Sequence, residues 1–326
     1  MSSVKDFMNA GEIKKFSCGK NFGFLNRLFS RMSDADKAEK LRKIQELVSQ
    51  SETGRETLAF LEKNETKIVF EKSKGYGFYA PEKNTIVLNR KASDQDLALT
   101  LIHEARHAKQ DKTMENISLE MTPETLLKNG FMIEADACAA ECVFAHEMME
   151  KGNRSFFDAQ QKSIYAPIGA AFEKEMAESG NANKAREAAM LKWYDLDVVR
   201  ESYGDQYVAL TKFAAEKWVE DPFTKSVSVK EMADKLCVDA QGKGYLSDPS
   251  VLDRPEKIML DDCQSVELKR NIYGFCQAKK RGLDGLGLDK IFTRHYDGKV
   301  TTFLFDMTGE TRSPVMAACL KRGAER

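Results

Sequence analysis

The residues of this chain best suited to catalysis are two histidines four positions apart, in the sequence His103-Glu104-Ala105-Arg106-His107. Residues four apart on an α-helix lie on one face, about one turn from each other. Two imidazoles placed in this way can each direct one nitrogen at the same metal ion, and neutral imidazole is a common zinc ligand. The spacing therefore predicts a helical site for Zn²⁺, with His103 and His107 as ligands.

Glu104 is rotated away from the edge formed by the two imidazoles but remains near it, so it can hydrogen-bond a water in an open coordination position. Zinc lowers the pKa of such a water and polarises a substrate carbonyl, while the carboxylate takes up the proton and delivers it to the leaving amine. The alternative is an ordinary helix that contains two histidines by chance. With four histidines in the chain, that coincidence is expected on the order of once in a few hundred chains. We therefore expect Glu104 to be the general base.

A catalytic zinc usually has three protein ligands and an open position, so a third ligand must come from elsewhere. Acids and cysteines gather among small residues at 134–142, and small residues let a helix pack closely against the first one. Glu134 is the predicted third ligand, against the alternative of a solvated helix charge. Cys138 and Glu141 lie on the same face at i+4 and i+7, and either could substitute. Asp136 points elsewhere and is predicted to accept the free N–H of a ligating histidine.

A helix and a small sheet must position these side chains. The helix that carries the histidines, here called the zinc helix, is predicted to begin after Ser93, with Asp96 completing the N-terminal cap. Before it, short β-branched and aromatic segments are separated by glycines and by a turn, at residues 68–70, 78–80 and 85–88. This pattern predicts two or three antiparallel strands.

Most of the chain after the zinc helix has helical periodicity. Thr122-Pro123 opens the helix that carries Glu134, because proline is well placed at the first helical position. Gly130 is expected to interrupt this helix. Further helices are predicted at residues 156–178, 183–203 and 228–237. The last quarter differs, since residues 291–305, with Asp297-Gly298 in the middle, predict a β-hairpin.

The order of a strand, the zinc helix and a helix with a glutamate resembles the gluzincin branch of zinc metallopeptidases. A fuller pattern is similar to bacterial domains that are assigned to the metallopeptidases by sequence alone. Its parts are Gly54-Arg55, residues 84–89, the zinc helix and residues 134–137. The resemblance covers roughly residues 50–150, or to residue 210 at its widest. Gluzincins often read Glu-x-x-x-Asp in the second helix, where this chain has Cys138.

The resemblance implies a zincin-like fold, bound zinc and a peptide or protein substrate. It also implies a strand beside the cleft that pairs with an extended peptide. Residues 85–88 are the expected strand, although an internal position for it is an equal alternative, because sequence does not distinguish edge strands. The longer metzincin spacing, His-x-x-Gly-x-x-His, does not follow His107.

These features predict an α+β, mainly helical fold. A zincin-like domain is expected at residues 32–220, with the small antiparallel sheet before the zinc helix. Residues 1–31 are interpreted as an N-terminal tail or docking segment. Residues 221–326 are interpreted as a smaller, mixed C-terminal region of unknown role, with the boundary near Asp221-Pro222.

Composition narrows the class of protein and of partner. Of 326 residues, 42% are hydrophobic and 31% charged, which is typical of a globular chain. The formal net charge of -1 gives no footprint for nucleic acid or for an anionic membrane, so neither is an expected partner. No secretory or membrane-spanning run is found, and the seven scattered cysteines indicate reduced thiols. We expect a cytoplasmic protein, with export through another kind of signal left open.

The leading functional prediction is a zinc-dependent peptidase. One alternative is a zinc-bearing sensor or interaction module with an inactive or slow site, although a structural site has no need of Glu104. The other is a zinc hydrolase of non-peptide amides. The oxyanion donor is left open among Tyr165, Tyr194 and Tyr203.

Overall fold

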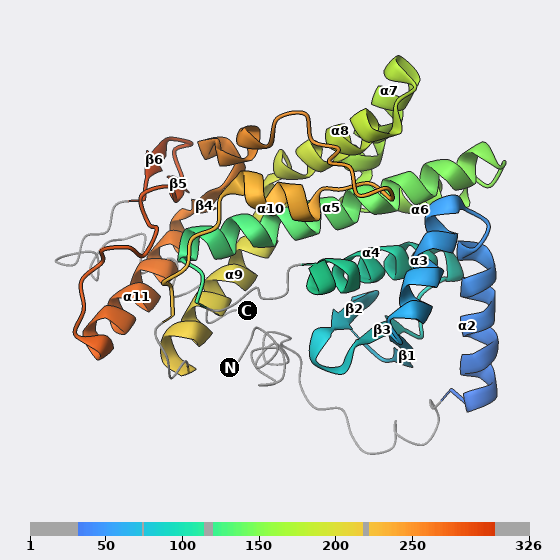
Figure 1. Cartoon of the computed structure of the whole chain (residues 1–326), viewed down its shortest axis with the longest axis horizontal. Helices are drawn as coiled ribbons and strands as arrows, with labels where there is room; N and C mark the ends of the chain where they lie inside the picture. The colour runs from blue at the N-terminus through green and yellow to red at the C-terminus, as the bar shows by residue number, and fades with distance from the viewer. Residues whose placement is uncertain (1–31, 74, 114–119, 218–221, 304–326) are drawn as a thin grey trace.

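The structure is a computed structural model, and it describes residues 32–73, 75–113, 120–217 and 222–303 (Figure 1). It is mainly helical with small sheets, which confirms the predicted α+β class. The predicted N-terminal segment, residues 1–31, lies outside the described residues.

The α-helices follow one another in this order: α2 (Asp34–Val48), α3 (Glu52–Lys63), α4 (Asp94–Thr113), α5 (Pro123–Glu150), α6 (Ser155–Gln160), α7 (Ala166–Ser179), α8 (Ala182–Tyr194), α9 (Asp197–Lys217), α10 (Val229–Leu236) and α11 (Asp262–Lys279). The strands are β1 (Lys67–Glu71), β2 (Gly77–Ala80), β3 (Thr85–Asn89), β4 (Met259–Asp261), β5 (Phe292–Arg294) and β6 (Val300–Thr302). Short 3₁₀ turns lie at η3 (Pro81–Lys83), η4 (Pro249–Asp253) and η5 (Pro255–Lys257).

Local capping sets the start of the two helices that carry the candidate site. The zinc helix is α4, and the Ser93 hydroxyl accepts the Asp96 backbone N–H at its first turn, as predicted. Thr122 caps α5 through the N–H of Thr125, and Pro123 occupies the first helical position. These side-chain oxygens satisfy backbone donors that would otherwise lack a partner.

The first sheet has the strand order β1-β3-β2, and it is mixed rather than antiparallel. Strand β3 pairs antiparallel with β2 but parallel with β1, so the antiparallel prediction is wrong for that second pair. The reason is burial: residues 85–88 are all buried, and a strand buried on both faces favours a central place with a partner on each edge. Residues 85–88 are therefore internal, and β1 and β2 are the edges.

The C-terminal sheet has the order β4-β5-β6. Strands β5 and β6 pair antiparallel, as the predicted hairpin requires, while residues 304 and 305 of that prediction lie outside the described part. The parallel pairing of β4 with β5 was not predicted.

Helix α5 runs through the middle of the fold, where it contacts α3 and α4 as well as α7, α8, α9 and α10 (Figure 1). Its first half packs into one core with Trp193, and its second half packs into another with α4 and the sheet. Gly130 does not interrupt α5, so that prediction is wrong. A Cβ there would lie 1.8 Å from the Tyr207 ring, so glycine lets α9 approach.

Other predicted helices divide into shorter ones. The predicted helix at 156–178 splits into α6 and α7, with Pro167 in the first turn of α7, and the one at 183–203 splits into α8 and α9.

Free, buried thiols occur at Cys138, Cys142, Cys237 and Cys276, whereas Cys263 is in a disulfide, contrary to the expectation of reduced thiols. None of the described helices has the length and apolar run needed to cross a bilayer.

Candidate metal centre

Helices α4 and α5 bring three potential metal ligands together. The Nε2 atoms of His103 and His107 lie 3.0 Å apart, and Glu134 Oε2 lies 3.4 Å and 3.5 Å from them. A tetrahedral zinc with bonds of about 2.0–2.1 Å has ligand atoms roughly 3.3–3.4 Å apart. The three predicted ligand residues are therefore spaced as a zinc site requires.

The other nitrogen of each imidazole is held by a hydrogen bond. His103 Nδ1 lies 2.5 Å from a carboxylate oxygen of Glu141, and His107 Nδ1 lies 2.8 Å from the amide oxygen of Gln110. The Gln110 amide nitrogen donates to Ile133 O and to Asp136, which fixes the amide oxygen toward His107. Both acceptors require a proton on Nδ1, so each Nε2 presents a lone pair to the cluster.

This tautomer assignment explains why the cluster favours a cation. Two Nε2 lone pairs 3.0 Å apart, beside a carboxylate, repel each other unless a positive charge lies between them. Burial alone would lower the pKa of His103, but hydrogen bonds with Cys138, Glu134 and Glu141 raise it well above its usual value. Burial alone would raise the pKa of Glu134, and the two imidazoles nevertheless hold it below its usual range. Groups that favour protons here also favour a divalent metal.

Glu104 is buried on α4 beside the cluster, and its charge interacts with both imidazoles and with Glu134. Burial raises its pKa above the usual glutamate value, and a hydrogen bond from the Tyr79 backbone partly opposes this change. Strand β2 therefore lies directly against the predicted general base.

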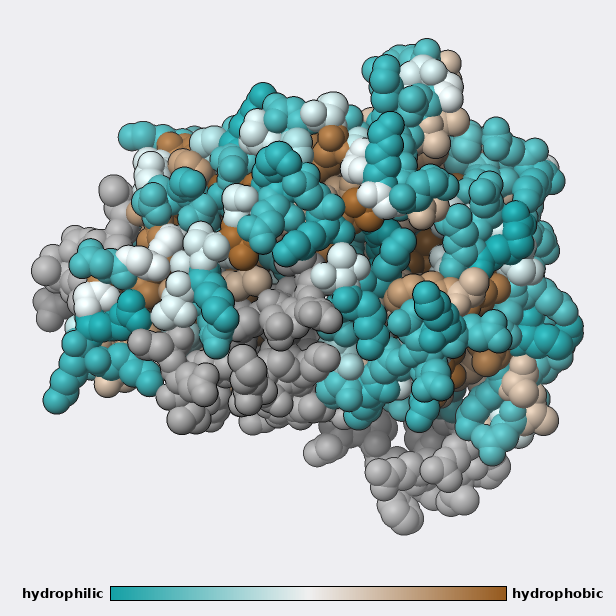
Figure 2. Space-filling model, in the orientation of Figure 1, coloured by the Kyte–Doolittle hydropathy of each residue, from teal (hydrophilic) through white to brown (hydrophobic). Residues whose placement is uncertain are grey.

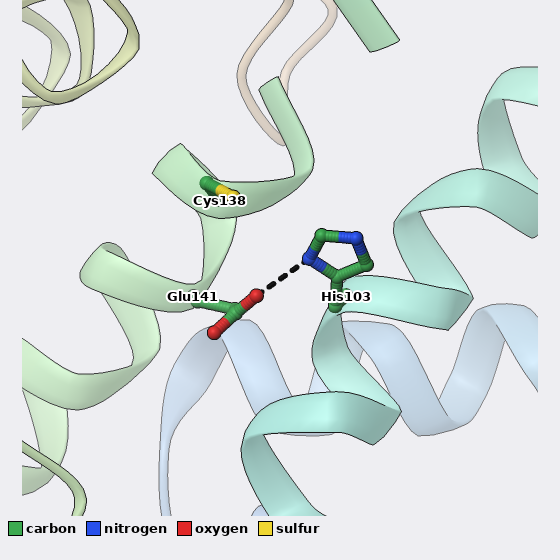
Figure 3. Close-up of side chains that lie close together, drawn as sticks. All are labelled: His103, Cys138 and Glu141. Carbon is green, nitrogen blue, oxygen red and sulfur yellow. Dashed lines mark hydrogen bonds and ion pairs between the residues drawn. The ribbon is translucent and has the colours of Figure 1, made fainter. Parts of the chain in front are cut away.

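A second group of potential ligands shares His103 with the first. Figure 3 shows Cys138 and Glu141 on α5 facing His103 on α4, with Glu141 bonded to Nδ1. Burial raises the pKa of the Cys138 thiol to about 12, so it stays protonated at neutral pH. This group has a single imidazole, and Glu141 in it fits the role of an acceptor that orients His103.

Asp136 does not contact a histidine, so its predicted role as a direct acceptor is wrong. It lies two residues after Glu134, which places it about 200° around the helix. There it accepts hydrogen bonds from Arg106, Arg186, Tyr245 and Gln110, at 2.5 to 3.1 Å. Asp136 consequently reaches His107 only through Gln110.

Arg106 links α4 to the C-terminal end of α10 and to the segment that follows it. Its guanidinium pairs with Asp136 and also donates to Leu236 O at 2.7 Å and to Val238 O at 3.0 Å. Tyr245, whose hydroxyl lies 2.7 Å from Asp136, comes from the same segment. The surroundings of the metal centre therefore include residues beyond position 221.

The profile of one protein family matches the chain. The Putative metallopeptidase family (DUF6782) matches residues 25–247, which is more than half of the 326 residues. The chain belongs to this family. Searches of curated proteins and of solved structures found no match.

Membership of the Putative metallopeptidase family implies a bound metal ion and supports a metallopeptidase-like assignment. The matched range includes all residues of the cluster as well as Tyr245. The donor set, two imidazoles and one carboxylate, suits zinc, which takes nitrogen and oxygen ligands in catalytic sites.

The sequence left three tyrosines open as oxyanion donors, and the structure places one of them differently from the other two. Tyr194 is buried in the core against Phe131, and the groups whose charge acts on it are Cys237, Tyr207 and Asp136 rather than a ligand residue. The hydroxyls of Tyr165 and Tyr203 lie 3.5 Å apart, and both interact with the charge of Glu134. Burial raises the pKa of Tyr165 to about 12, so its hydroxyl remains a donor at neutral pH.

Sequence reasoning missed Gln110, and it considered Glu141 only as a substitute ligand. Gln110 lies three residues after His107, a spacing at which helical side chains meet, so this partner was detectable. The remaining histidines form other pairs: His146 Nδ1 lies 3.0 Å from Glu173, and His295 Nδ1 lies 2.8 Å from Asp262.

Proposed function

We propose that this chain is a zinc-dependent peptidase in which His103, His107 and Glu134 bind the metal and Glu104 is the general base. The observation that carries the proposal is the convergence of the two Nε2 atoms and Glu134 Oε2 within 3.0 to 3.5 Å. The fixed Nδ1 protons add support, because they leave both Nε2 lone pairs free for a metal.

Zinc bound there would act as a Lewis acid that polarises a carbonyl and makes water more acidic. Glu104 would take the proton from the attacking water and pass it to the leaving amine. Its burial raises its pKa, which makes it a stronger base than an exposed glutamate. The Tyr79 N–H would hold the carboxylate in place during both transfers.

The substrate would lie along β2. Asn89 N donates to Tyr76 O, so the antiparallel register places the backbone groups of Tyr76 and Phe78 toward β3. The backbone groups of Gly77 and Tyr79 then point away from β3, and Tyr79 N–H accordingly reaches Glu104. An extended peptide could pair with the remaining groups of this edge, which would place its carbonyl beside the water that Glu104 deprotonates.

Tyr165 and Tyr203 would supply hydroxyl donors to the oxygen that becomes negative during attack. The charge of Glu134 acts on both tyrosines, so both lie near the ligand cluster, and they come from the α5, α7 and α9 part of the fold rather than from the sheet. Glu104 would lie on the β2 side. A scissile carbonyl between these two sides would be attacked by the water that Glu104 deprotonates, and its oxygen would accept a hydrogen bond from a tyrosine hydroxyl.

Replacing Glu104 by Gln tests the proposal, since it preserves size and leaves the ligands in place. Zinc content should be unchanged, and hydrolysis of a peptide library should fall by about a hundredfold or more. The matched control is Glu150→Gln, at an exposed position on α5, which should leave hydrolysis unchanged.

Other outcomes of this experiment are informative. Zinc binding without hydrolysis of any peptide by the wild-type chain would favour a sensor or interaction module. Hydrolysis of non-peptide amides but not of peptides would favour the alternative of a zinc hydrolase that acts on non-peptide amides. Full peptidase activity in Glu104→Gln would assign the base to another residue.

A further inference from the structure

A cavity lies on the side of the zinc helix away from the imidazoles. Its volume is about 300 Å³, at the lower end of the range for small-molecule sites. Its floor is apolar and comes from Ile102 and Ala105 of α4 with Ala140 and Val143 of α5. Figure 2 shows the surface hollowed beside α3, with brown apolar atoms at the bottom.

The two walls of this cavity carry opposite charges. Glu52 and Glu56 of α3, with Glu147 of α5, form an acidic wall. Arg106 and Lys109 of α4, with Arg186 of α8, form a basic wall. An apolar floor between two walls of opposite sign suits a small molecule that carries both charges.

The basic wall has unused hydrogen-bond donors. Arg186 is only 8% exposed, and among the described residues its guanidinium makes one hydrogen bond, to Asp136 at 3.1 Å, and stacks on the Tyr245 ring, 4.4 Å from its centroid. In the part of the chain that the structure describes, neither its Nε, which is buried, nor its Nη1 has an acceptor, so Nη1 is the donor left for a ligand. Lys109 is partly buried and forms no ion pair within 4.0 Å among the described residues. Asp239 also lines this wall, but it accepts hydrogen bonds from Asn183 and from the backbone of the following turn.

Two carboxylates of the acidic wall, those of Glu52 and Glu56, accept no hydrogen bond from a described residue. Glu147 accepts the backbone N–H and the hydroxyl of Thr53 at the start of α3, at 2.9 and 2.7 Å. Glu56, one turn further along α3, has no hydrogen bond to a described residue and lies at the rim of the cavity. Of Glu52 and Glu56, Glu56 is the one whose charge acts on Lys109 of the basic wall, so it is the carboxylate placed to receive the cationic end of a ligand whose anionic end lies at Lys109.

We propose that this cavity binds a small zwitterionic peptide, with its carboxylate at Lys109 and Arg186 and its ammonium at Glu56. A dipeptide with free termini separates the two charges by a short apolar body, as the floor requires. The ligand would gain charge-assisted hydrogen bonds at both ends without breaking any that the protein already makes. This site is separate from the metal centre and does not depend on hydrolysis there.

Calorimetric titration of the full-length protein carrying Glu104→Gln tests the proposal without turnover of the probe. The probes are alanyl-leucine, its N-acetyl form, which lacks the ammonium, and its C-terminal amide, which lacks the carboxylate. Alanyl-leucine should bind saturably, and each blocked probe should bind at least about tenfold more weakly, as loss of one charged contact implies.

Variants of the two walls then assign each end of the ligand. Glu56→Gln should weaken alanyl-leucine but leave the affinity for the N-acetyl form unchanged. Lys109→Gln should weaken alanyl-leucine but leave the affinity for the amide unchanged. Two exposed neighbours provide matched controls, Glu62→Gln on α3 and Lys112→Gln on α4, and neither should change any affinity.

The metal centre could also bind a peptide, so the titration is repeated with His103→Ala added. Retained binding of alanyl-leucine supports the second site, and loss of all binding would assign the ligand to the metal centre and overturn the proposal. Absence of saturable binding, or equal binding of the free and both blocked probes, would overturn it as well. Far-UV circular dichroism confirms that each variant is folded before its affinity is compared.

Discussion

The amide oxygen of Gln110 lies 2.8 Å from Nδ1 of His107, so this imidazole is oriented from within its own helix. The Gln110 amide nitrogen is in turn held by Asp136 and by the Ile133 carbonyl on α5. The orientation of a proposed metal ligand therefore depends on how α4 and α5 pack.

Gln110→Leu should weaken zinc binding by roughly 10–100-fold, because it removes the acceptor that fixes the tautomer and the ring of His107. Competition with a chromophoric chelator measures the affinity. Gln45→Leu changes an exposed glutamine on α2 and should have no effect. An unchanged zinc affinity in Gln110→Leu would show that the packing around His107 alone orients it.

Asp136→Asn should destabilise the fold by about 3–5 kcal/mol, because it leaves Arg106 and Arg186 buried without their counter-charge. Urea unfolding at pH 7 measures the loss of unfolding free energy. A difference near zero would mean that the two guanidinium groups are neutralised by other groups.

The difference in unfolding free energy between the wild type and Asp136→Asn should depend on pH. Burial would raise the pKa of Asp136, but Arg106 and Arg186 hold it below its ordinary value of 3.8. A carboxyl with a lowered folded-state pKa stabilises the fold above its unfolded pKa, and this contribution is lost as pH falls through the folded pKa. The wild-type advantage over Asp136→Asn should therefore be constant above about pH 5 and should shrink only in more acidic urea titrations. A maximum of that advantage in acid would contradict the assignment.

Gly77→Ala should displace β2 from the zinc helix. A Cβ at Gly77 would lie 2.7 Å from Thr100 Cγ2 and 2.7 Å from the Val87 carbonyl, so the strand must shift. Overpacking of this kind costs typically about 1–3 kcal/mol, and hydrolysis should fall as the Tyr79 N–H leaves Glu104. Gly75→Ala is the matched control, because its Cβ would meet nothing within 4 Å. If Gly77→Ala and Gly75→Ala had equal unfolding free energies and equal rates of hydrolysis, the proposed role of β2 would be refuted.

Local features of the structure could be predicted because they depend on residues close in sequence. The caps at Ser93 and Thr122, the helical spacing of His103 and His107, and the hairpin near Asp297 each follow from a few neighbouring positions. The approach of Glu134 to the histidines followed from small residues that allow close packing. The structure places Glu134 beside both imidazoles.

Features that depend on distant residues could not be predicted in the same way. The order of the first sheet depends on which strand is buried on both faces, and this is a property of the folded core. The contact between Asp136 and Tyr245 joins positions 109 residues apart. Gly130 wrongly predicted a helix break, because a glycine is needed at this position to leave room for the ring of Tyr207 from α9.

Metal analysis of the purified full-length protein tests the central claim most directly. The wild-type chain should carry about one zinc, as a single three-ligand site implies. Glu134→Ala and His103→Ala should lose it, whereas Glu141→Ala should retain zinc with weaker affinity, because Glu141 orients His103 and does not bind the metal. A wild-type chain without zinc, or zinc retained in Glu134→Ala and lost in Glu141→Ala, would contradict the proposed centre.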